Sequence, residues 1–163
     1  GFDQNKILFE QIKDPTIQAI LLGKLGLASE NKITLTIDED CYLDKVPEHI
    51  KPEQLVSIIG NLIDNAIEAV QGLKNGTVIF SATDLGNDLV IEVSNNGDCI
   101  PEHMMKDIFK RGFSTKEKEG RGYGLAIINE TLRELQGDII VKNQSTGGVN
   151  FSVFIPKRRA ISV

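Results

Sequence analysis

A polar stripe runs along a predicted helix that is otherwise apolar. Between residues 53 and 71, apolar side chains recur every three or four positions. The polar positions that share one arc of this helix are Ser57, Asn61, Asp64, Asn65 and Glu68. One interpretation is the solvated face of an amphipathic helix, but such faces are usually built from lysine, glutamate and arginine, and asparagine is a poor helix former. Asn61 and Asn65, one turn apart, favour a site that needs neutral oxygen ligands, of the kind that suits magnesium bound to substrate phosphates.

Two glycine-rich stretches follow this helix in the sequence. The first, residues 95–101 (NNGDCIP), comes directly after a predicted strand, and an ordinary turn is the alternative interpretation. The second, residues 120–125 (GRGYGL), has three glycines at alternate positions and leads straight into a predicted helix. Its backbone is free to lie close to a ligand, and the first N–H groups of the helix favour phosphate. Neither the strand context of a dinucleotide-binding fold nor the GK[ST] ending of a P-loop is present.

The segment between the glycine-rich stretches, residues 108–119 (IFKRGFSTKEKE), is densely charged. One interpretation is a surface loop. The other is a lid over phosphates, for which Lys116 and Arg121 would supply positive charge.

The elements that must position these residues are predicted from periodicity and turn signals. Asp14-Pro15 is typical of a helix start, and Gly137 of a helix end. The predicted helices cover residues 1–12, 14–28, 53–71, 102–109 and 125–136, and the predicted strands cover residues 33–37, 77–82, 89–94, 138–143 and 149–155. Because helices and strands do not alternate strictly, we expect a mostly antiparallel sheet covered on one face by helices, an α+β two-layer sandwich.

Composition limits the class of protein. The chain has 163 residues, 18 lysines and arginines against 23 aspartates and glutamates, and a net charge of −5. An acidic chain with no basic cluster is a poor nucleic-acid binder. No apolar run approaches the roughly 20 residues that span a bilayer, and two cysteines do not indicate an oxidising compartment. We expect a soluble, single-domain, cytoplasmic protein.

Four stretches, in this order, resemble the ATP-binding boxes of the histidine-kinase branch of the GHKL superfamily. Residues 61–66 resemble the N box, residues 95–101 the first glycine box, Ile108-Phe109 with Phe113 the F box, and residues 120–125 the second glycine box. The resemblance covers residues 50–157, about two-thirds of the chain.

This resemblance implies a Bergerat-type ATP-binding fold and two parts of the chain. Residues 31–163 would be the ATP-binding catalytic domain, and residues 1–30 the remnant of a dimerisation or linker helix. Residues 12–19 and Ser114-Thr115-Lys116 look most like the citrate and C4-dicarboxylate sensor kinases.

The resemblance also implies roles for individual residues. Asn65 would coordinate magnesium with help from Asn61, and Asn95 would face the exocyclic amine of adenine. The residues implied to bind ATP are Asn61, Asn65, Asn95, Gly97, Ile100, Phe109, Thr115, Lys116, Arg121, Gly122, Tyr123, Gly124 and Leu125.

Two positions depart from the family pattern. Most members carry aspartate where Asn95 stands, so the acceptor oxygen is kept and the charge is lost. Cys99 replaces the usual second glycine and Asp98 a common proline. Both departures predict a weaker or narrower adenine pocket.

Asn61 indicates transfer of phosphate rather than hydrolysis. The hydrolysing members of the superfamily have glutamate at this position, and a carboxamide cannot take a proton from water. The family places the acceptor histidine on an upstream helix, whereas His49 lies in a predicted loop and His103 on the predicted short helix that follows the first glycine box. We therefore expect a sensor histidine kinase that transfers the γ-phosphate to a histidine outside this chain.

The partners implied by the resemblance depend on that expectation. They are ATP and ADP, the dimerisation and phosphoacceptor helices of the parent kinase, and a response regulator, with the parent anchored in the cell membrane. Two alternatives stay open at this point: a serine protein kinase of the anti-sigma type, and a non-catalytic nucleotide-sensing module.

Overall fold

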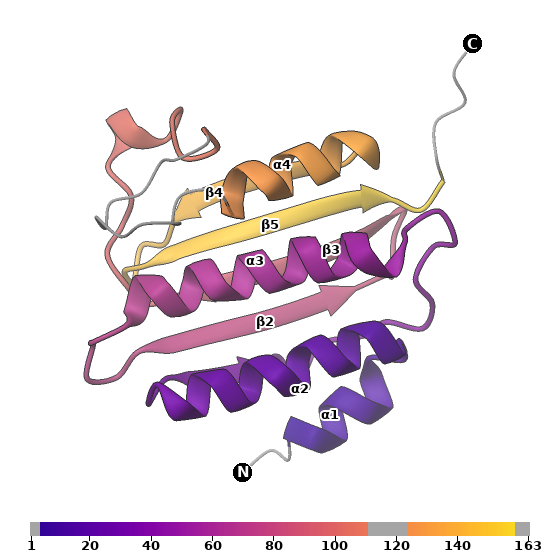
Figure 1. Ribbon diagram of the computed structural model, residues 1–163, viewed down its shortest axis with the longest axis horizontal. Coiled ribbons are helices and arrows are strands. Elements are labelled where there is room, and N and C mark those ends of the chain that lie inside the picture. The colour runs from indigo at the N-terminus through magenta and orange to yellow at the C-terminus, as the bar shows by residue number, and fades with distance from the viewer. Residues whose placement is uncertain (1–3, 111–123, 159–163) are drawn as a thin grey trace.

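The computed structural model describes residues 4–110 and 124–158, which form helices and strands in the predicted order. The helices are α1 (Gln4–Gln11), α2 (Pro15–Glu30), α3 (Pro52–Val70), the 3₁₀ turn η1 (Glu102–Met104) and α4 (Gly124–Glu134). The strands are β1 (Thr34–Ile37), β2 (Thr77–Thr83), β3 (Asp88–Asn95), β4 (Asp138–Asn143) and β5 (Val149–Pro156). Figure 1 shows them coloured along the chain.

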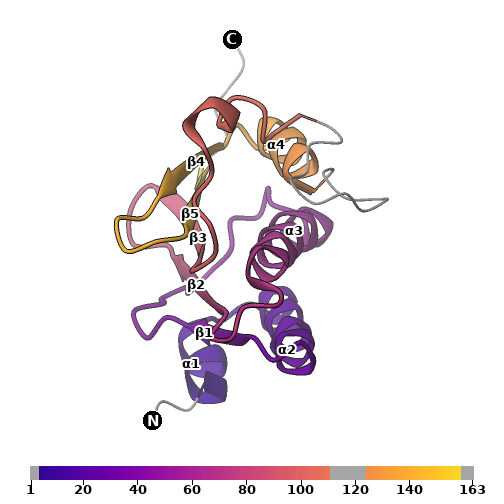
Figure 2. The ribbon, with the colours of Figure 1, turned by 90° about the vertical axis from the view of Figure 1, so that its left-hand side faces the viewer.

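The strands of the described residues form one sheet in the order β1-β2-β3-β5-β4. β1 pairs with β2 in parallel, and the other three pairs are antiparallel. Helices α2, α3 and α4 lie on the same face of this sheet (Figure 2). The predicted two-layer α+β architecture with a mostly antiparallel sheet is confirmed.

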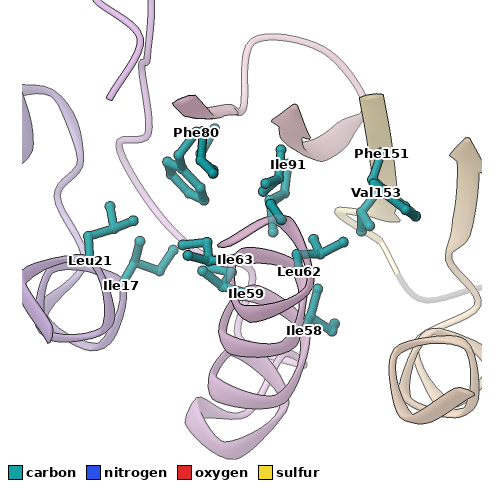
Figure 3. Close-up of a cluster of buried hydrophobic side chains, with 14 of the residues drawn as sticks. Ile17, Leu21, Ile58, Ile59, Leu62, Ile63, Phe80, Ile91, Phe151 and Val153 are labelled. Carbon is teal, nitrogen blue, oxygen red and sulfur yellow. The ribbon is translucent and has the colours of Figure 1, made fainter. Parts of the chain in front are cut away.

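The core lies between the helix layer and the inner face of the sheet. In β3 and β5 every second residue is buried, as expected for strands with one covered face. Ile58, Ile59, Leu62 and Ile63 of α3 point from the helix layer toward the sheet, where they meet side chains such as Phe80 (Figure 3). Helix α3 is therefore the central support of the molecule, and its opposite side carries the polar stripe.

The beginning of the chain belongs to the same core. Asp14 caps α2 by accepting a hydrogen bond of 2.9 Å from the N–H of Ile17. Ile17 and Leu21 of α2 and Leu8 of α1 are fully buried in the cluster that also contains α3. The division of the chain at residues 30 and 31 stays a prediction, and the packing of α2 is continuous with that of α3. Among the described helices, none combines the length and the apolar character that crossing a membrane requires.

One predicted element is different in the structure. The helix expected over residues 102–109 is a single 3₁₀ turn at Glu102–Met104, and turns continue from there to Phe109. Ile108 is buried in the core, with 2% of its surface exposed. Met105 and Phe109 are partly buried against the same core, so tertiary contacts hold this segment in place without a regular helix.

Candidate nucleotide site

The candidate site lies along the outer side of α3. The apolar side of α3 is buried, whereas Asn61 and Asn65 are half-buried on its other side. The Asn61 amide nitrogen donates a hydrogen bond of 2.6 Å to the carbonyl of Ser57, one turn earlier. This bond fixes the side chain so that its oxygen is the group left for a ligand.

The start of α4 lies directly beside that oxygen. A Cβ atom added at Gly124 would lie 3.1 Å from Oδ1 of Asn61. Glycine therefore lets the N-terminus of α4 approach the N box closely, which places the N–H groups of a helix start near an amide oxygen. Leu125 packs against the core in the same turn.

The end of β3 supplies the other end of the site. Asn95 continues the inward-facing series of that strand and is 5% exposed, at the place where the apolar core gives way to polar groups. Its Oδ1 accepts a hydrogen bond of 2.9 Å from the N–H of Gly97. A Cβ atom at Gly97 would lie 2.6 Å from the carbonyl oxygen of Ala69, in the last turn of α3. Gly97 is thus required for the first glycine-rich stretch to pack against α3.

These contacts order the site along one helix. Ala69 lies eight residues after Asn61, which corresponds to about 12 Å along an α-helix. Gly97 and Asn95 mark one end of this span and Gly124 the other, with Asn65 between them. The span suits an extended ligand such as a nucleoside triphosphate, with its base and its phosphates at opposite ends.

Two residues that hold the site together were missed in the sequence. Asn143, the last residue of β4, donates to the carbonyl of Ile100 and accepts from its N–H, both at 2.8 Å. Gly148 has a φ of 89°, and a Cβ atom there would lie 1.9 Å from the carbonyl oxygen of Asn95. Gly147 and Gly148 stand between the last two predicted strands, where a glycine pair indicates a turn, but the sequence does not show what that turn contacts.

The segment that resembles the F box lies against β4. Phe109 is half-buried, and with Met105 and Ile108 it lines a groove of about 450 Å³ against Val141 and Asn143. Asn143 is the link between this groove and the first glycine-rich stretch, through its bonds to Ile100.

The other predicted nucleotide-binding residues are in the part of the chain that the structure does not describe. They are Thr115, Lys116, Arg121, Gly122 and Tyr123. The second glycine-rich stretch is therefore represented by Gly124 and Leu125 alone.

The cysteines differ in their surroundings. Cys41 is buried beside β2, with its Sγ 3.8 Å from the carbonyl oxygen of Phe80, and its burial raises the pKa of the thiol. Cys99 is exposed, and its Sγ lies 3.5 Å from the carbonyl oxygen of Gly148. The side chain that replaces a glycine of the family pattern therefore sits at the junction of β3 and β5.

The sequence of this chain is similar to those of known proteins and matches one protein family. Residues 50–159 match the family described as "Histidine kinase-, DNA gyrase B-, and HSP90-like ATPase". "Sensor protein CitS" of Bacillus subtilis is 48% identical over 157 residues, which are 96% of this chain and 29% of that protein. A "Probable C4-dicarboxylate sensor kinase" of Halalkalibacterium halodurans is 34% identical, over 94% of this chain and 29% of that protein. This chain spans less than a third of the length of either relative.

Solved structures agree with the sequence relatives. The catalytic domain of histidine kinase ThkA has a TM-score of 0.69 at 28% identity, covering 87% of this chain and 90% of that one. Full-length ShkA, solved with AMPPNP, shares the fold with a TM-score of 0.69 at 21% identity, over 86% of this chain and 30% of its own. The chain therefore belongs to the histidine kinase-, DNA gyrase B- and HSP90-like ATPase family, and within it to the histidine kinase ATPase domains of sensor kinases such as CitS.

Proposed function

We propose that this domain binds Mg-ATP along α3, with adenine at the Asn95–Gly97 end and the phosphates at the Asn61–Gly124 end. The observation that carries the proposal is the order of contacts on α3. Gly97 meets Ala69, and Gly124 meets Asn61 two turns earlier. The base would lie beside a buried amide, and the γ-phosphate beside the start of α4.

The amide oxygens of Asn61 and Asn65 fit a magnesium ion that is bound mainly through phosphates. The ion takes oxygen ligands and usually keeps several waters, so one or two protein oxygens are enough. When bound, magnesium would neutralise charge on the phosphates. Because the amide nitrogen of Asn61 is already bonded to Ser57, its oxygen is the atom directed to the ligand.

Asn61 also supports phosphate transfer over hydrolysis. A carboxamide cannot accept a proton from an attacking water. The carboxylate of Asp64, on the same helix, is bound to Lys24 of α2 at 2.6 Å. Phosphoryl transfer needs positioning and charge stabilisation more than a base, which suits this set of groups.

We further propose that the whole protein is a membrane-anchored sensor kinase whose ATPase domain lies in the cytoplasm. Residues 1–30 would lead to its dimerisation helices, and residues 31–163 would hold ATP. The acceptor histidine would come from those helices, and a response regulator would then take the phosphate. Within the described residues, Nε2 of His49 is buried without a hydrogen-bond partner, and His103 lies in η1, the 3₁₀ turn that follows the first glycine-rich stretch.

A transfer experiment tests this function. The full-length kinase that contains this chain is incubated with Mg-ATP labelled on the γ-phosphate, and the labelled residue is identified. We expect an acid-labile, alkali-stable label on a histidine outside residues 1–163. An acid-stable label on a serine of a partner would show the serine-kinase alternative, and ATP binding with no transfer would show a nucleotide-sensing module.

A further inference from the structure

Strand β4 lies at the edge of the sheet. Among the described strands it pairs with β5 alone, at the end of the order β1-β2-β3-β5-β4. The strand at the other edge, β1, has four residues and lies next to α1 (Figure 2), whereas β4 has six. Natural sheets protect long edge strands with proline, bulges, like charges or a covering segment. The sequence of β4, DIIVKN, has no proline, and its two charged residues have opposite signs, so they do not repel a second copy of the strand.

The alternation of the backbone shows which groups of β4 point away from β5. The N–H of Gln144 donates to the carbonyl of Gly148, in step with the pairing of β4 and β5. Residues two apart in an antiparallel pair point their backbone groups the same way, so Ile140 also bonds toward β5. Ile139 and Val141 therefore point their N–H and C=O groups outward. Within the described residues, neither makes a backbone hydrogen bond outside the sheet ladder.

The segment beside this edge leaves it open. The groove of about 450 Å³ is lined by the last three residues of β4 on one side and by residues of 102–109 on the other. Val141 packs against the core on the inner face of the sheet, whereas Lys142 is exposed on the outer face. A groove that both residues line runs along the edge between the two faces. The space beside the end of β4 is therefore free for an added strand.

The outer face of β4 carries a pattern that is complementary to itself. Asp138, Ile140 and Lys142 alternate on this face, all three are exposed, and Ile140 is 45% exposed. Within residues 4–110 and 124–158, neither Asp138 nor Lys142 belongs to an ion pair. Two antiparallel copies centred on Ile140 would place each aspartate opposite a lysine and the two isoleucines opposite each other. Opposite charges and apolar side chains in such cross-strand positions stabilise a pair of strands.

We propose that β4 pairs in an antiparallel manner with β4 of a second copy of this chain, about a two-fold axis at Ile140, so that the two sheets become one. In this register Ile139 lies opposite Val141 of the second copy, and both residues have outward-pointing backbone groups to exchange. The two copies of Ile140 then form a non-hydrogen-bonded pair, the kind in which side chains lie closest. The symmetry repeats each contact, so the Asp138–Lys142 pair occurs twice. One pair of short strands is a small interface, which suits a weak association that depends on concentration.

Charge reversal tests the register. Asp138→Lys places like charges opposite one another at both copies of the Asp138–Lys142 pair, and so does Lys142→Asp. We expect each single variant to raise the dimer Kd at least about fivefold, because like charges directly opposite are destabilising. The double variant Asp138→Lys/Lys142→Asp restores both opposite-charge pairs, so its Kd should return to within about twofold of the parent value. Sedimentation equilibrium of this chain between about 10 μM and about 1 mM measures these constants.

Two isoleucines provide a matched pair of variants. Ile140 and Ile79 lie on the outer face of the sheet and are 45% and 40% exposed, but Ile79 belongs to β2, which is paired on both sides. We expect Ile140→Lys to raise the dimer Kd at least about fivefold and Ile79→Lys to leave it within about twofold of the parent value. Urea unfolding checks that both variants are folded.

Cross-linking locates the two-fold axis. In a non-hydrogen-bonded pair the two Cα atoms are about 4.5 Å apart, a distance that a disulfide can span. Under mild oxidation we expect Ile140→Cys to give a disulfide that joins position 140 of two copies, and Ile79→Cys to give none at position 79. Peptide masses distinguish these products from disulfides of Cys41 or Cys99.

Three results would overturn the proposal. They are a chain that stays monomeric up to about 1 mM, a dimer with equal Kd in Ile140→Lys and Ile79→Lys, and a double charge variant that dimerises as weakly as the single ones. Asp138, Ile140 and Lys142 are outside the proposed nucleotide site, so Mg-ATP affinity should be the same in all these variants. A monomeric chain that binds Mg-ATP would leave the proposed function intact, and a dimer that does not bind Mg-ATP would leave the pairing of β4 intact.

Discussion

Asn95 illustrates how one side chain can serve both the fold and the ligand. It occupies the last inward-facing position of β3, after Leu89, Ile91 and Val93, and it is nearly fully buried. One lone pair of its Oδ1 accepts the N–H of Gly97, and in the proposed site the second would accept the adenine amine. The residue type decides how strongly that second bond is made.

Asn95→Asp is expected to strengthen ATP binding. A carboxylate oxygen keeps the bond to Gly97, and a hydrogen bond to a charged acceptor contributes roughly 1 kcal/mol more than a neutral one, or about fivefold in affinity. Isothermal titration with Mg-ATP measures the change. An equal or larger gain for Mg-GTP, which has no exocyclic amine at that position, would contradict the assignment of Asn95 to adenine.

Asn65→Ala is expected to weaken Mg-ATP binding at least about tenfold, because a magnesium ligand is lost. Circular dichroism should be unchanged, since the side chain is half-buried on the polar side of α3. Glu53→Ala, at an exposed position in the first turn of the same helix, serves as the control. Retained affinity in Asn65→Ala would remove the polar stripe from the site.

The alkylation rates of the two cysteine thiols test the proposed site in the unsubstituted chain. We expect Cys41 to resist alkylation in the folded protein, because it is buried and its thiol pKa is raised by that burial. Exposed Cys99 should react, and more slowly when Mg-ATP is bound. Mass spectrometry of the alkylated peptides follows both rates. No protection of Cys99 by Mg-ATP would place the adenine elsewhere than beside the first glycine-rich stretch.

At the scale of elements, the junction between the end of β3 and the start of β5 forms the proposed base end of the site. Gly148 brings β5 against the carbonyl of Asn95, and Asn143 of β4 ties down Ile100. None of these contacts is local in the sequence. Residues 61–66 and 120–125 could be proposed as site segments from their own composition, whereas Asn143 was predicted as no more than the end of a strand.

Gly148→Ala and Gly147→Ala separate a steric requirement from a conformational one. Both glycines have positive φ, 89° and 100°, and both substitutions should cost about 1 kcal/mol for that reason. At Gly148 the added Cβ also meets Asn95, so we expect a further loss of about 2 kcal/mol. Urea unfolding compares the two free energies. Equal losses would contradict the close approach of β5 to β3.

Gly124→Val tests the junction of α3 and α4. A Cβ atom there would lie 3.1 Å from the oxygen of Asn61, and the branched side chain would occupy the space assigned to phosphate. We expect Mg-ATP affinity to fall at least about tenfold, on the scale of a lost charge-assisted hydrogen bond, while the free energy of unfolding changes little. Unchanged affinity would contradict the phosphate role of the α4 N-terminus.

At the scale of the whole molecule, the sequence predicted the two-layer architecture and each strand to within about two residues, the usual margin at element ends. The alternation of apolar and polar residues in 89–94 and in 149–155 was enough to predict these two strands, because one face of each strand is buried. The strand order β1-β2-β3-β5-β4 could not be predicted, because pairing joins segments that are distant in the chain. The 3₁₀ turn at Glu102–Met104 was predicted as a longer helix, because its anchoring at Ile108 depends on the core.

Helix α3 is the element through which the proposed site can be tested as a whole. Its buried side packs against the sheet, and its polar side carries the proposed nucleotide site. Because the two functions use different sides of the helix, nucleotide binding should leave the fold unchanged. Comparing the affinities for different nucleotides tests the proposed base end and the proposed phosphate end in one experiment.

The most direct measurement is isothermal titration of this chain with Mg-ATP, Mg-ADP and Mg-GTP. The predicted result is one site per chain for both adenine nucleotides, with Mg-GTP at least about tenfold weaker because its base presents a carbonyl where adenine presents an amine to Asn95. Binding that is absent, or equal for Mg-ATP and Mg-GTP, would contradict the site proposed along α3.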